Sequence, residues 1–215
     1  MQVAFVLFPN LTQLDLTGPL QILHRLPGAT IHLAAASREP VPSDCGLSLV
    51  PTCTFEEVSK VDLLCIPGGF GVSGAIREPR LMEFVSRAGG QAQYLTSVCT
   101  GAFVLGAAGL LKGKRATTHW AYRDLLTKVG AIPVDQRVVK DGPVITGGGV
   151  TAGIDFAFTV VEEIAGTEMA ERIQVGLEYR PEAREYPNQE HVALRSVQNG
   201  YAARIEEFSR ELEAL

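Results

Sequence analysis

The amino-acid sequence predicts an α/β fold with a largely parallel central sheet and helices on both faces of that sheet. Two apolar runs, residues 3–8 (VAFVLF) and 61–66 (VDLLCI), have the length and composition of parallel strands that are buried on both sides. Segments with apolar residues at helical spacing alternate with the predicted strands along the chain. The 215 residues contain no internal repeat and no linker, which indicates one well-buried domain.

The elements of the first half follow from apolar patterns and turn residues. The predicted strands are residues 3–8, 30–36 and 61–66. Leucines at positions 16, 20 and 23 indicate a helix after the first strand, and a second helix is expected over residues 80–88. The Pro- and Ser-rich residues 37–51 are expected to form a loop or a small hairpin at the sheet edge, followed by a short helix at 55–58.

The second half continues this alternation. The predicted strands are residues 94–98, 115–120, 134–139 and 143–146. The predicted helices are residues 100–111, 121–129 (ended by Gly130) and 154–165. Residues 1–180 are therefore expected to form the α/β domain. The tail, residues 181–215, has a polar stretch at 182–189 and charges at helical spacing from position 191. It is expected to be an amphipathic helix packed on the domain or on a dimer partner.

The stretch around Cys99 changes within one residue from strand composition (YLTSV) to that of a helix rich in small residues (TGAFVLGAAGLL). A cysteine at this junction lies on a strand-to-helix turn, which is the geometry of a nucleophile elbow. Backbone N–H groups and the dipole of the following helix favour an anion there. We therefore expect an exposed thiol with a lowered pKa that acts as a nucleophile. The alternative is a buried cysteine that only fills space.

Functional residues of open α/β sheets gather beyond the carboxyl ends of the strands. Four segments follow predicted strands in this way. They are the loop with Thr12 and Asp15, the turn Pro67-Gly68-Gly69, the elbow, and the glycine run after Thr146 that contains Gly148. We therefore expect these segments to share one site, although they lie far apart in sequence.

Asp15 stands among apolar residues in LTQLDLTGPL, where an acidic group is locally out of place. One explanation is an N-cap carboxylate for the helix that begins near Thr17. The other is a contact with Cys99. In that case the two groups share one proton, the pKa of the carboxyl group is raised, and Asp15 serves as a proton donor to sulfur and substrate.

Gly68 and Gly69 lack side chains, so their N–H groups are able to approach a ligand closely. Together with the N–H of Thr100 they form a candidate oxyanion hole, and a plain tight turn is the competing explanation. The Thr100 hydroxyl adjoins the nucleophile and either acts in catalysis or bonds its own helix backbone. His119 is a candidate for the pocket wall and for a general base, although no acidic residue adjoins it in sequence.

Charge and cysteine spacing exclude several classes of protein. The formal net charge is −5 and the pI is about 5.4, which argues against non-specific nucleic-acid binding. The four cysteines include no C-x-x-C pair and no histidine at ligand spacing, so no metal site is expected. No signal peptide and no apolar run of membrane-spanning length is evident. We therefore expect a cytoplasmic protein with reduced thiols and no membrane partner.

These motifs, taken in order and spacing, resemble the ThiJ/PfpI superfamily over residues 1–180. The stretches that carry the resemblance are VAFVLFPNLTQLDLTGPLQIL, LLCIPGGFG, TSVCTGAFVLGAAGLL, RATTHW and ITGGGVTAGIDFAFTVVEEIAG. The resemblance implies a flavodoxin-like three-layer sandwich with a cysteine nucleophile elbow. Asp15 occupies a position where many members have Glu. Thr100 stands where proteases of this superfamily have His, which argues against protease activity.

The first-loop Asp, the Cys-Thr elbow and the THW segment are most similar to those of isonitrile hydratases, which convert R–N≡C and water into an N-substituted formamide. This resemblance implies a covalent thioimidate on Cys99, with Asp15 as general acid and base and Thr100 assisting. It also implies an isonitrile substrate, a homodimer, and no metal or organic cofactor. Similar domains occur in AraC-type regulators, so a non-catalytic small-molecule or thiol redox sensor is the alternative.

Overall fold

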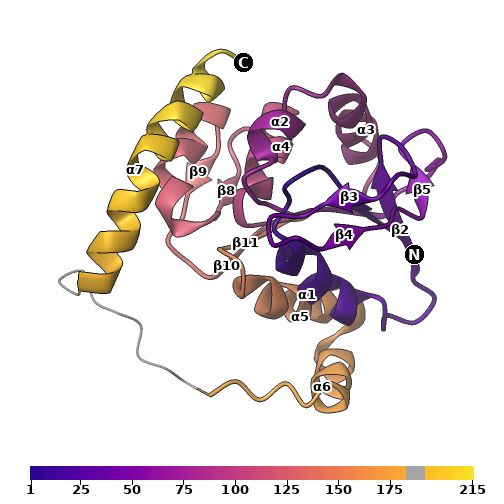
Figure 1. Cartoon of the computed structure of the whole chain (residues 1–215). Helices are drawn as coiled ribbons and strands as arrows, with labels where there is room; N and C mark the ends of the chain where they lie inside the picture. Colours follow the sequence, from indigo (N-terminus) through magenta and orange to yellow (C-terminus); the bar gives the residue numbers. More distant parts are fainter. Residues whose placement is uncertain (183–191) are drawn as a thin grey trace.

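The computed structural model describes residues 1–182 and 192–215 and confirms the α/β architecture (Figure 1). A seven-stranded sheet lies at its centre. In sheet order its strands are β10 (Val138–Asp141), β11 (Val144–Gly147), β7 (Tyr94–Val98), β6 (Leu63–Ile66), β1 (Gln2–Val6), β2 (Thr30–Ala35) and β5 (Cys53–Thr54). All neighbours run parallel except the edge strand β10, which is antiparallel to β11.

The central strands are buried on both faces, as their apolar runs predict. Residues 3–6 of β1 and all residues of β6 have no exposed surface. Each Val, Leu, Ile or Phe buried in this way stabilises the fold by about 1.5–3 kcal/mol relative to an exposed side chain. Because β1, β6 and β7 are adjacent and parallel, their carboxyl ends meet at one edge of the sheet. The loops that follow these three strands form the site described below.

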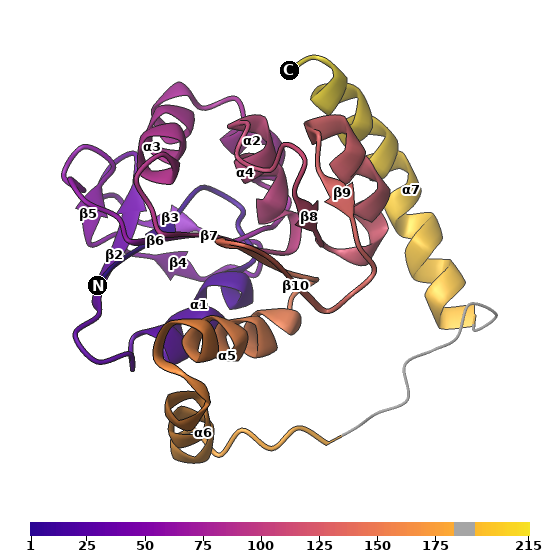
Figure 2. The same cartoon turned by 180° about the vertical axis from the view of Figure 1, so that it is seen from behind.

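Helices cover both faces of the sheet and complete three layers (Figures 1 and 2). One face carries α1 (Gln13–Leu23) and α5 (Ala152–Ala165), with α6 (Thr167–Gly176) packed on α5. The other face carries α2 (Val72–Ala75), α3 (Pro79–Gly89) and α4 (Ala102–Ala107). The sequence patterns do not indicate α2 or α6. The predicted three-layer sandwich is confirmed.

The segment after β2 combines a confirmed prediction with a wrong one. The small hairpin expected within residues 37–51 is present, since β3 (Val41–Pro42) and β4 (Ser48–Leu49) pair in antiparallel fashion. The short helix expected at 55–58 is absent, because residues 55–57 form a turn after β5. The Glu57 carboxylate accepts a 2.7 Å hydrogen bond from the Thr54 N–H and so closes this turn.

The strand predicted at 115–120 is also wrong for most of its length. Only β8 (Arg115–Ala116) is extended, and it pairs with β9 (Ile132–Pro133) in a separate two-stranded sheet. The next N–H group, that of Thr117, donates a 2.8 Å hydrogen bond to the Thr146 hydroxyl. A side-chain bond thus replaces the backbone ladder that a longer strand would need.

Other bounds in this half differ from their predictions by a few residues. The helix expected at 121–129 is a 3₁₀ helix, η2 (Trp120–Val129), and it ends at Gly130 in the left-handed conformation with φ at 75°. The strand pair is present as β10 and β11, but β10 begins at residue 138 instead of 134. Similarly, α4 ends at residue 107 instead of 111.

The C-terminal helix α7 (Val192–Glu213) lies against η2, at one end of the sheet. Phe208 and Leu212 of this helix are buried, and the Phe208 ring meets the Phe103 ring edge-on at 4.9 Å between centroids. Residues 183–191 of the predicted tail lie outside the described residues. No helix in the described part of the chain has the length and apolar composition needed to cross a membrane.

Candidate active site

The elbow holds Cys99 in a left-handed backbone conformation with φ at 55°, which is strained for a residue with a side chain. β7 ends at Val98, and a 3₁₀ turn (Cys99–Gly101) leads into α4. Two hydrogen bonds hold the strained residue. Its N–H donates to the Gly148 carbonyl at 3.1 Å, and its carbonyl accepts from the Thr118 hydroxyl at 2.6 Å. The predicted junction therefore has the geometry of a nucleophile elbow.

Glycines allow the backbone segments around the elbow to approach one another closely. A Cβ atom on Gly101 would lie 2.2 Å from the Ile66 carbonyl oxygen, and one on Gly68 would lie 2.5 Å from the Thr100 nitrogen. Both separations are far below a normal contact distance. The end of β6 and the turn after it therefore pack on the elbow only because these positions lack side chains.

Asp15 lies in the first turn of α1 and has no exposed surface. Its Oδ2 accepts a 3.1 Å hydrogen bond from the Gly68 N–H, and its Oδ1 has no partner among the described residues. The capping explanation is excluded, because the N-cap of α1 is Thr12 and no side chain caps this helix.

Burial raises the pKa of Asp15 to about 7. The hydrogen bond from the Gly68 N–H opposes this rise, as does the adjacent Cys99 side chain to a smaller extent, and the charge of Asp44 adds to it. The direction of the shift agrees with the prediction. Its main cause is burial, however, and not a neighbouring thiolate. The carboxyl group therefore exchanges a proton near neutral pH.

The prediction of an exposed, ionised Cys99 is wrong. The residue is only 5% exposed. Burial, and after it the charge of Asp15, raises the pKa of the Cys99 thiol well above its ordinary value. The N–H groups of Thr100 and Val150 oppose the rise through hydrogen bonds to sulfur. These N–H groups and the short 3₁₀ turn stabilise the thiolate by less than burial destabilises it, so the thiol keeps its proton at neutral pH.

The N–H groups of Gly68 and Gly69 are already engaged, contrary to the predicted oxyanion hole. Gly68 donates to Asp15, and Gly69 donates to the Thr100 hydroxyl at 2.9 Å. That hydroxyl in turn donates to the Gly69 carbonyl at 3.2 Å, so it ties the loop after β6 to the elbow. Val150, whose N–H faces the sulfur instead, has a strained φ of 21° that nothing in the sequence indicates.

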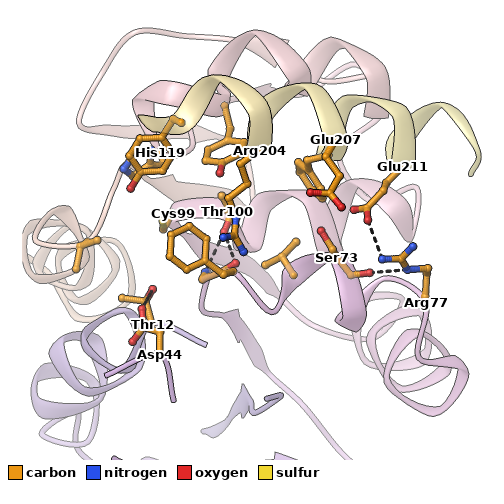
Figure 3. Close-up of a pocket in the computed structure, with 17 residues that line it drawn as sticks. Thr12, Asp44, Ser73, Arg77, Cys99, Thr100, His119, Arg204, Glu207 and Glu211 are labelled. Atoms are coloured by element: carbon orange, nitrogen blue, oxygen red, sulfur yellow. Dashed lines mark hydrogen bonds and ion pairs between the residues drawn. The ribbon is translucent and has the colours of Figure 1, made fainter. Parts of the chain in front are cut away.

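A cavity of about 390 Å³ lies beside the elbow (Figure 3). It brings together five of the residues selected from the sequence, namely Thr12, Gly69, Cys99, Thr100 and His119. The other three do not line it. Asp15 adjoins Cys99 from the buried side, Gly68 supports Asp15, and Gly148 supports the Cys99 backbone.

One wall of this cavity comes from α7, which the sequence does not indicate as part of the site (Figure 3). The α7 residues that line it are Tyr201, Arg204, Glu207, Phe208 and Glu211. Tyr122 of η2 and Phe70 of the loop after β6 also line it. The cavity is therefore aromatic beside the elbow and charged further along α7.

His119 belongs to the aromatic part of the wall. Its ring centroid lies 5.3 Å from that of Tyr201 and 5.9 Å from that of Tyr122. The Nδ1 atom accepts a 3.3 Å hydrogen bond from the Ala121 N–H, which leaves the proton of the neutral ring on Nε2. Burial lowers the pKa of His119 to about 4, so the ring is a weak base at neutral pH. This property argues against the predicted general-base role.

The profile of the DJ-1/PfpI family matches residues 1–163. The chain belongs to the DJ-1/PfpI family. Among curated members it is 53% identical over 181 residues to the isonitrile hydratase of Pseudomonas putida, and the match covers 84% of this chain and 79% of that enzyme. It is 30% identical over 197 residues to the HTH-type transcriptional regulator CdhR of Pseudomonas aeruginosa, covering 88% of this chain and 57% of the regulator.

A solved DJ-1/PfpI structure shares the fold described above. The crystal structure of a THiJ/PfpI family protein from Pseudomonas syringae has a TM-score of 0.90 and is 40% identical. The superposition covers 99% of this chain and 89% of that chain. The family resemblance and the flavodoxin-like fold expected from the sequence are therefore confirmed.

Proposed function

We propose that this protein is an isonitrile hydratase, a hydro-lyase that adds water to R–N≡C and forms an N-substituted formamide. The observation that carries the proposal is the 53% identity, over 84% of the chain, to the Pseudomonas putida enzyme of that name. The site supports it independently. A carboxyl group whose pKa is about 7 adjoins a thiol at the wall of a cavity that is aromatic beside the elbow, and the two form a proton-sharing pair.

Asp15 acts first as a base. When Asp15 is ionised and Cys99 keeps its proton, the carboxylate takes the thiol proton, and the pair retains one proton in total. The N–H groups of Thr100 and Val150 stabilise the thiolate as it forms. The sulfur attacks the electrophilic isonitrile carbon. A C–S bond forms as one π bond between nitrogen and carbon breaks, its electron pair moves onto nitrogen, and the carbon keeps its own lone pair as an imidoyl anion.

The protonated Asp15 then donates its proton to the same carbon, which gives the thioimidate R–N=CH–S on Cys99. Oδ1 is the oxygen that carries the proton, because Oδ2 is held by Gly68 and Oδ1 has no partner among the described residues. Because this carbon is bonded to the Cys99 sulfur, and Asp15 adjoins Cys99, the carboxyl group reaches the carbon although Asp15 does not line the cavity.

Water completes the reaction. The water oxygen attacks the thioimidate carbon while the Asp15 carboxylate removes a proton from the water. Asp15 then passes this proton to the nitrogen. The tetrahedral species collapses, the C–S bond breaks, and the thiolate and the formamide separate. The hydroxyl proton returns to the pair of Cys99 and Asp15. One isonitrile and one water are consumed for each formamide released. Thr100 holds the loop after β6 in place through these steps.

The same proposal includes a homodimer in the cytoplasm. Leu47 and Val50, in the hairpin of β3 and β4, are 53% and 63% exposed, and Asp44 of the same hairpin lines the cavity. A partner subunit that covers these apolar side chains would lie near the cavity mouth. A reducing compartment suits a mechanism that needs the free thiol of Cys99. Light scattering during size-exclusion chromatography tests the dimer, and the mass of a single chain would contradict it.

A small-molecule sensor is the second candidate, because the regulator CdhR is 30% identical over 88% of this chain. Such a protein would bind a ligand in the cavity without turnover, or it would respond to oxidation of Cys99. The raised pKa of the buried thiol disfavours rapid oxidation, since the thiolate is the reactive form.

Turnover of cyclohexyl isocyanide in water enriched in ¹⁸O distinguishes the two candidates. The hydratase forms N-cyclohexylformamide that carries one labelled oxygen, and Cys99→Ala abolishes this product. Mass spectrometry of the product gives both results. A wild-type protein that forms no formamide, but oxidises quickly at Cys99 with dilute peroxide, is a sensor and not a hydratase.

A further inference from the structure

The cavity extends from the elbow along α7 into a charged region (Figure 3). The charged residues that line it are Asp44, Arg77, Arg204, Glu207 and Glu211. Arg77 and Glu211 form an ion pair at 2.8 Å, and Asp44 accepts a 2.6 Å hydrogen bond from the Thr12 hydroxyl. Arg204 forms no ion pair and no hydrogen bond with any residue in the described part of the chain.

Arg204 is held by an aromatic ring. Its guanidinium carbon lies 3.6 Å from the centroid of the Phe70 ring, so the cation stacks on the ring face. Stacking fixes the plane of the guanidinium group and leaves the N–H donors around its edge free. A planar cation presented in this way matches a carboxylate, which accepts two parallel N–H bonds from it.

Arg204 and Cys99 line the same cavity, together with Tyr122 of η2. In Figure 3 the Arg204 side chain extends from α7 toward Thr100, the residue after the nucleophile. Because Arg204 and Cys99 line one cavity, we expect a single bound molecule to reach the sulfur and the guanidinium.

We propose that the substrates of this site are short isocyano carboxylates, and that Arg204 is the specificity-determining residue that binds their carboxylate while Cys99 attacks the isonitrile carbon. This inference rests on the proposed hydratase function. Glu211 is neutralised by Arg77, so Arg204 supplies the cationic site near the elbow. Glu207, which follows Arg204 by three residues on α7 and also lines the cavity, repels the carboxylate.

A pair of matched substrates tests the inference: isocyanoacetate and its uncharged methyl ester. The wild-type protein is expected to have a kcat/KM at least about tenfold higher for isocyanoacetate, as one charge-assisted bidentate contact implies. Arg204→Ala is expected to lower the ratio of kcat/KM for isocyanoacetate to that for the ester to about one, and Arg204→Lys is expected to retain part of the preference. Glu207→Gln is expected to raise the ratio. Arg210→Ala is the matched control. Arg210 is an exposed arginine of α7 that does not line the cavity, so this variant keeps the wild-type ratio.

Binding of the product N-formylglycine, measured by calorimetry, decides the inference without turnover. It is expected to weaken by about tenfold or more in Arg204→Ala and to stay unchanged in Arg210→Ala. A wild-type preference for the ester, or an Arg204→Ala variant that keeps both the kcat/KM ratio and the affinity for N-formylglycine, overturns the inference. If no isonitrile is hydrated, the hydratase proposal fails separately, and the binding result still decides whether Arg204 is a carboxylate site.

Discussion

The N–H group of Gly68 donates a 3.1 Å hydrogen bond to Oδ2 of Asp15, and the other oxygen of this buried carboxyl group has no partner among the described residues. One oxygen is thereby fixed and the other is left to carry a proton. The turn after β6 therefore orients the carboxyl group, and burial raises its pKa to about 7.

The rate of hydration is expected to rise with pH. The proposed first step needs ionised Asp15 as the base for Cys99, so kcat/KM should increase as the carboxyl group loses its proton, with a midpoint near its pKa of about 7. The raised pKa of Cys99 keeps the thiol protonated over this range. The pH profile of kcat/KM for an uncharged isonitrile checks this. A flat profile, or one that falls between pH 6 and pH 8, would show that Asp15 is not the base.

Asp15→Asn is expected to remove activity and to stabilise the fold. Loss of a general acid and base lowers kcat by about 10²–10⁴-fold. The pKa of Asp15 is about 7 in the folded chain against an ordinary value of 3.8, so the folded state holds a proton that the unfolded chain has lost. Wild-type stability therefore falls as pH rises from about 4 to about 7, and this loss is complete above pH 7.

Asparagine does not titrate. The free energy of unfolding of the variant, relative to that of the wild type, should therefore rise by about 4 kcal/mol between pH 4 and pH 8. Urea unfolding at both pH values measures the change. Asp124→Asn, at an exposed position outside the cavity lining, is the control and keeps the wild-type pH dependence. An equal difference between Asp15→Asn and wild type at the two pH values would contradict the raised pKa.

Thr118→Val is expected to loosen the elbow. The Thr118 hydroxyl donates a 2.6 Å hydrogen bond to the Cys99 carbonyl, and both residues are buried. Valine keeps the shape and leaves that carbonyl unsatisfied, which costs about 1–3 kcal/mol of stability. Because Thr118 touches the nucleophile's backbone and does not line the cavity, kcat should fall more than KM changes. Thr118→Ser restores the hydroxyl and should restore kcat, and a serine variant as slow as the valine variant would exclude this positioning role.

Gly101→Ala tests the close packing of the elbow on the end of β6. The added Cβ atom would lie 2.2 Å from the Ile66 carbonyl oxygen, so backbone segments must move apart at a cost of about 1–3 kcal/mol or more. Gly74→Ala is the matched control, because a Cβ atom there meets nothing within 4 Å. In helix α2 it should stabilise the fold by up to about 1 kcal/mol. Thermal unfolding of both variants gives the comparison, and equal stabilities would mean that the elbow tolerates the extra methyl group.

The strands and the elbow could be predicted because local sequence determines them. Residues 3–6 and 63–66 are apolar without interruption, and a run of that length is typical of a parallel strand buried on both faces. The change of composition at Cys99 marks the strand-to-helix turn in the same local way. The order of strand ends then places Thr12, Gly69 and Cys99 around one cavity.

The electrostatics of the site could not be predicted from local sequence. The burial that raises the pKa of Cys99 comes from the packing of several separate segments. The strained backbone of Val150, which directs its N–H toward the sulfur, is evident only from the three-dimensional structure. The cavity wall from α7 was missed for a similar reason. Tyr201 and Arg204 lie on a helix with intermittent apolar residues, a pattern that indicates a packed face without indicating what it packs against.

Mass spectrometry of the protein, quenched with acid during turnover of cyclohexyl isocyanide, tests whether Cys99 is the covalent nucleophile. We expect an adduct equal in mass to one isonitrile on the peptide that contains Cys99, absent from Cys99→Ala, with the formamide oxygen derived from water. Full hydratase turnover by Cys99→Ala, with no adduct on the wild-type protein, would contradict it.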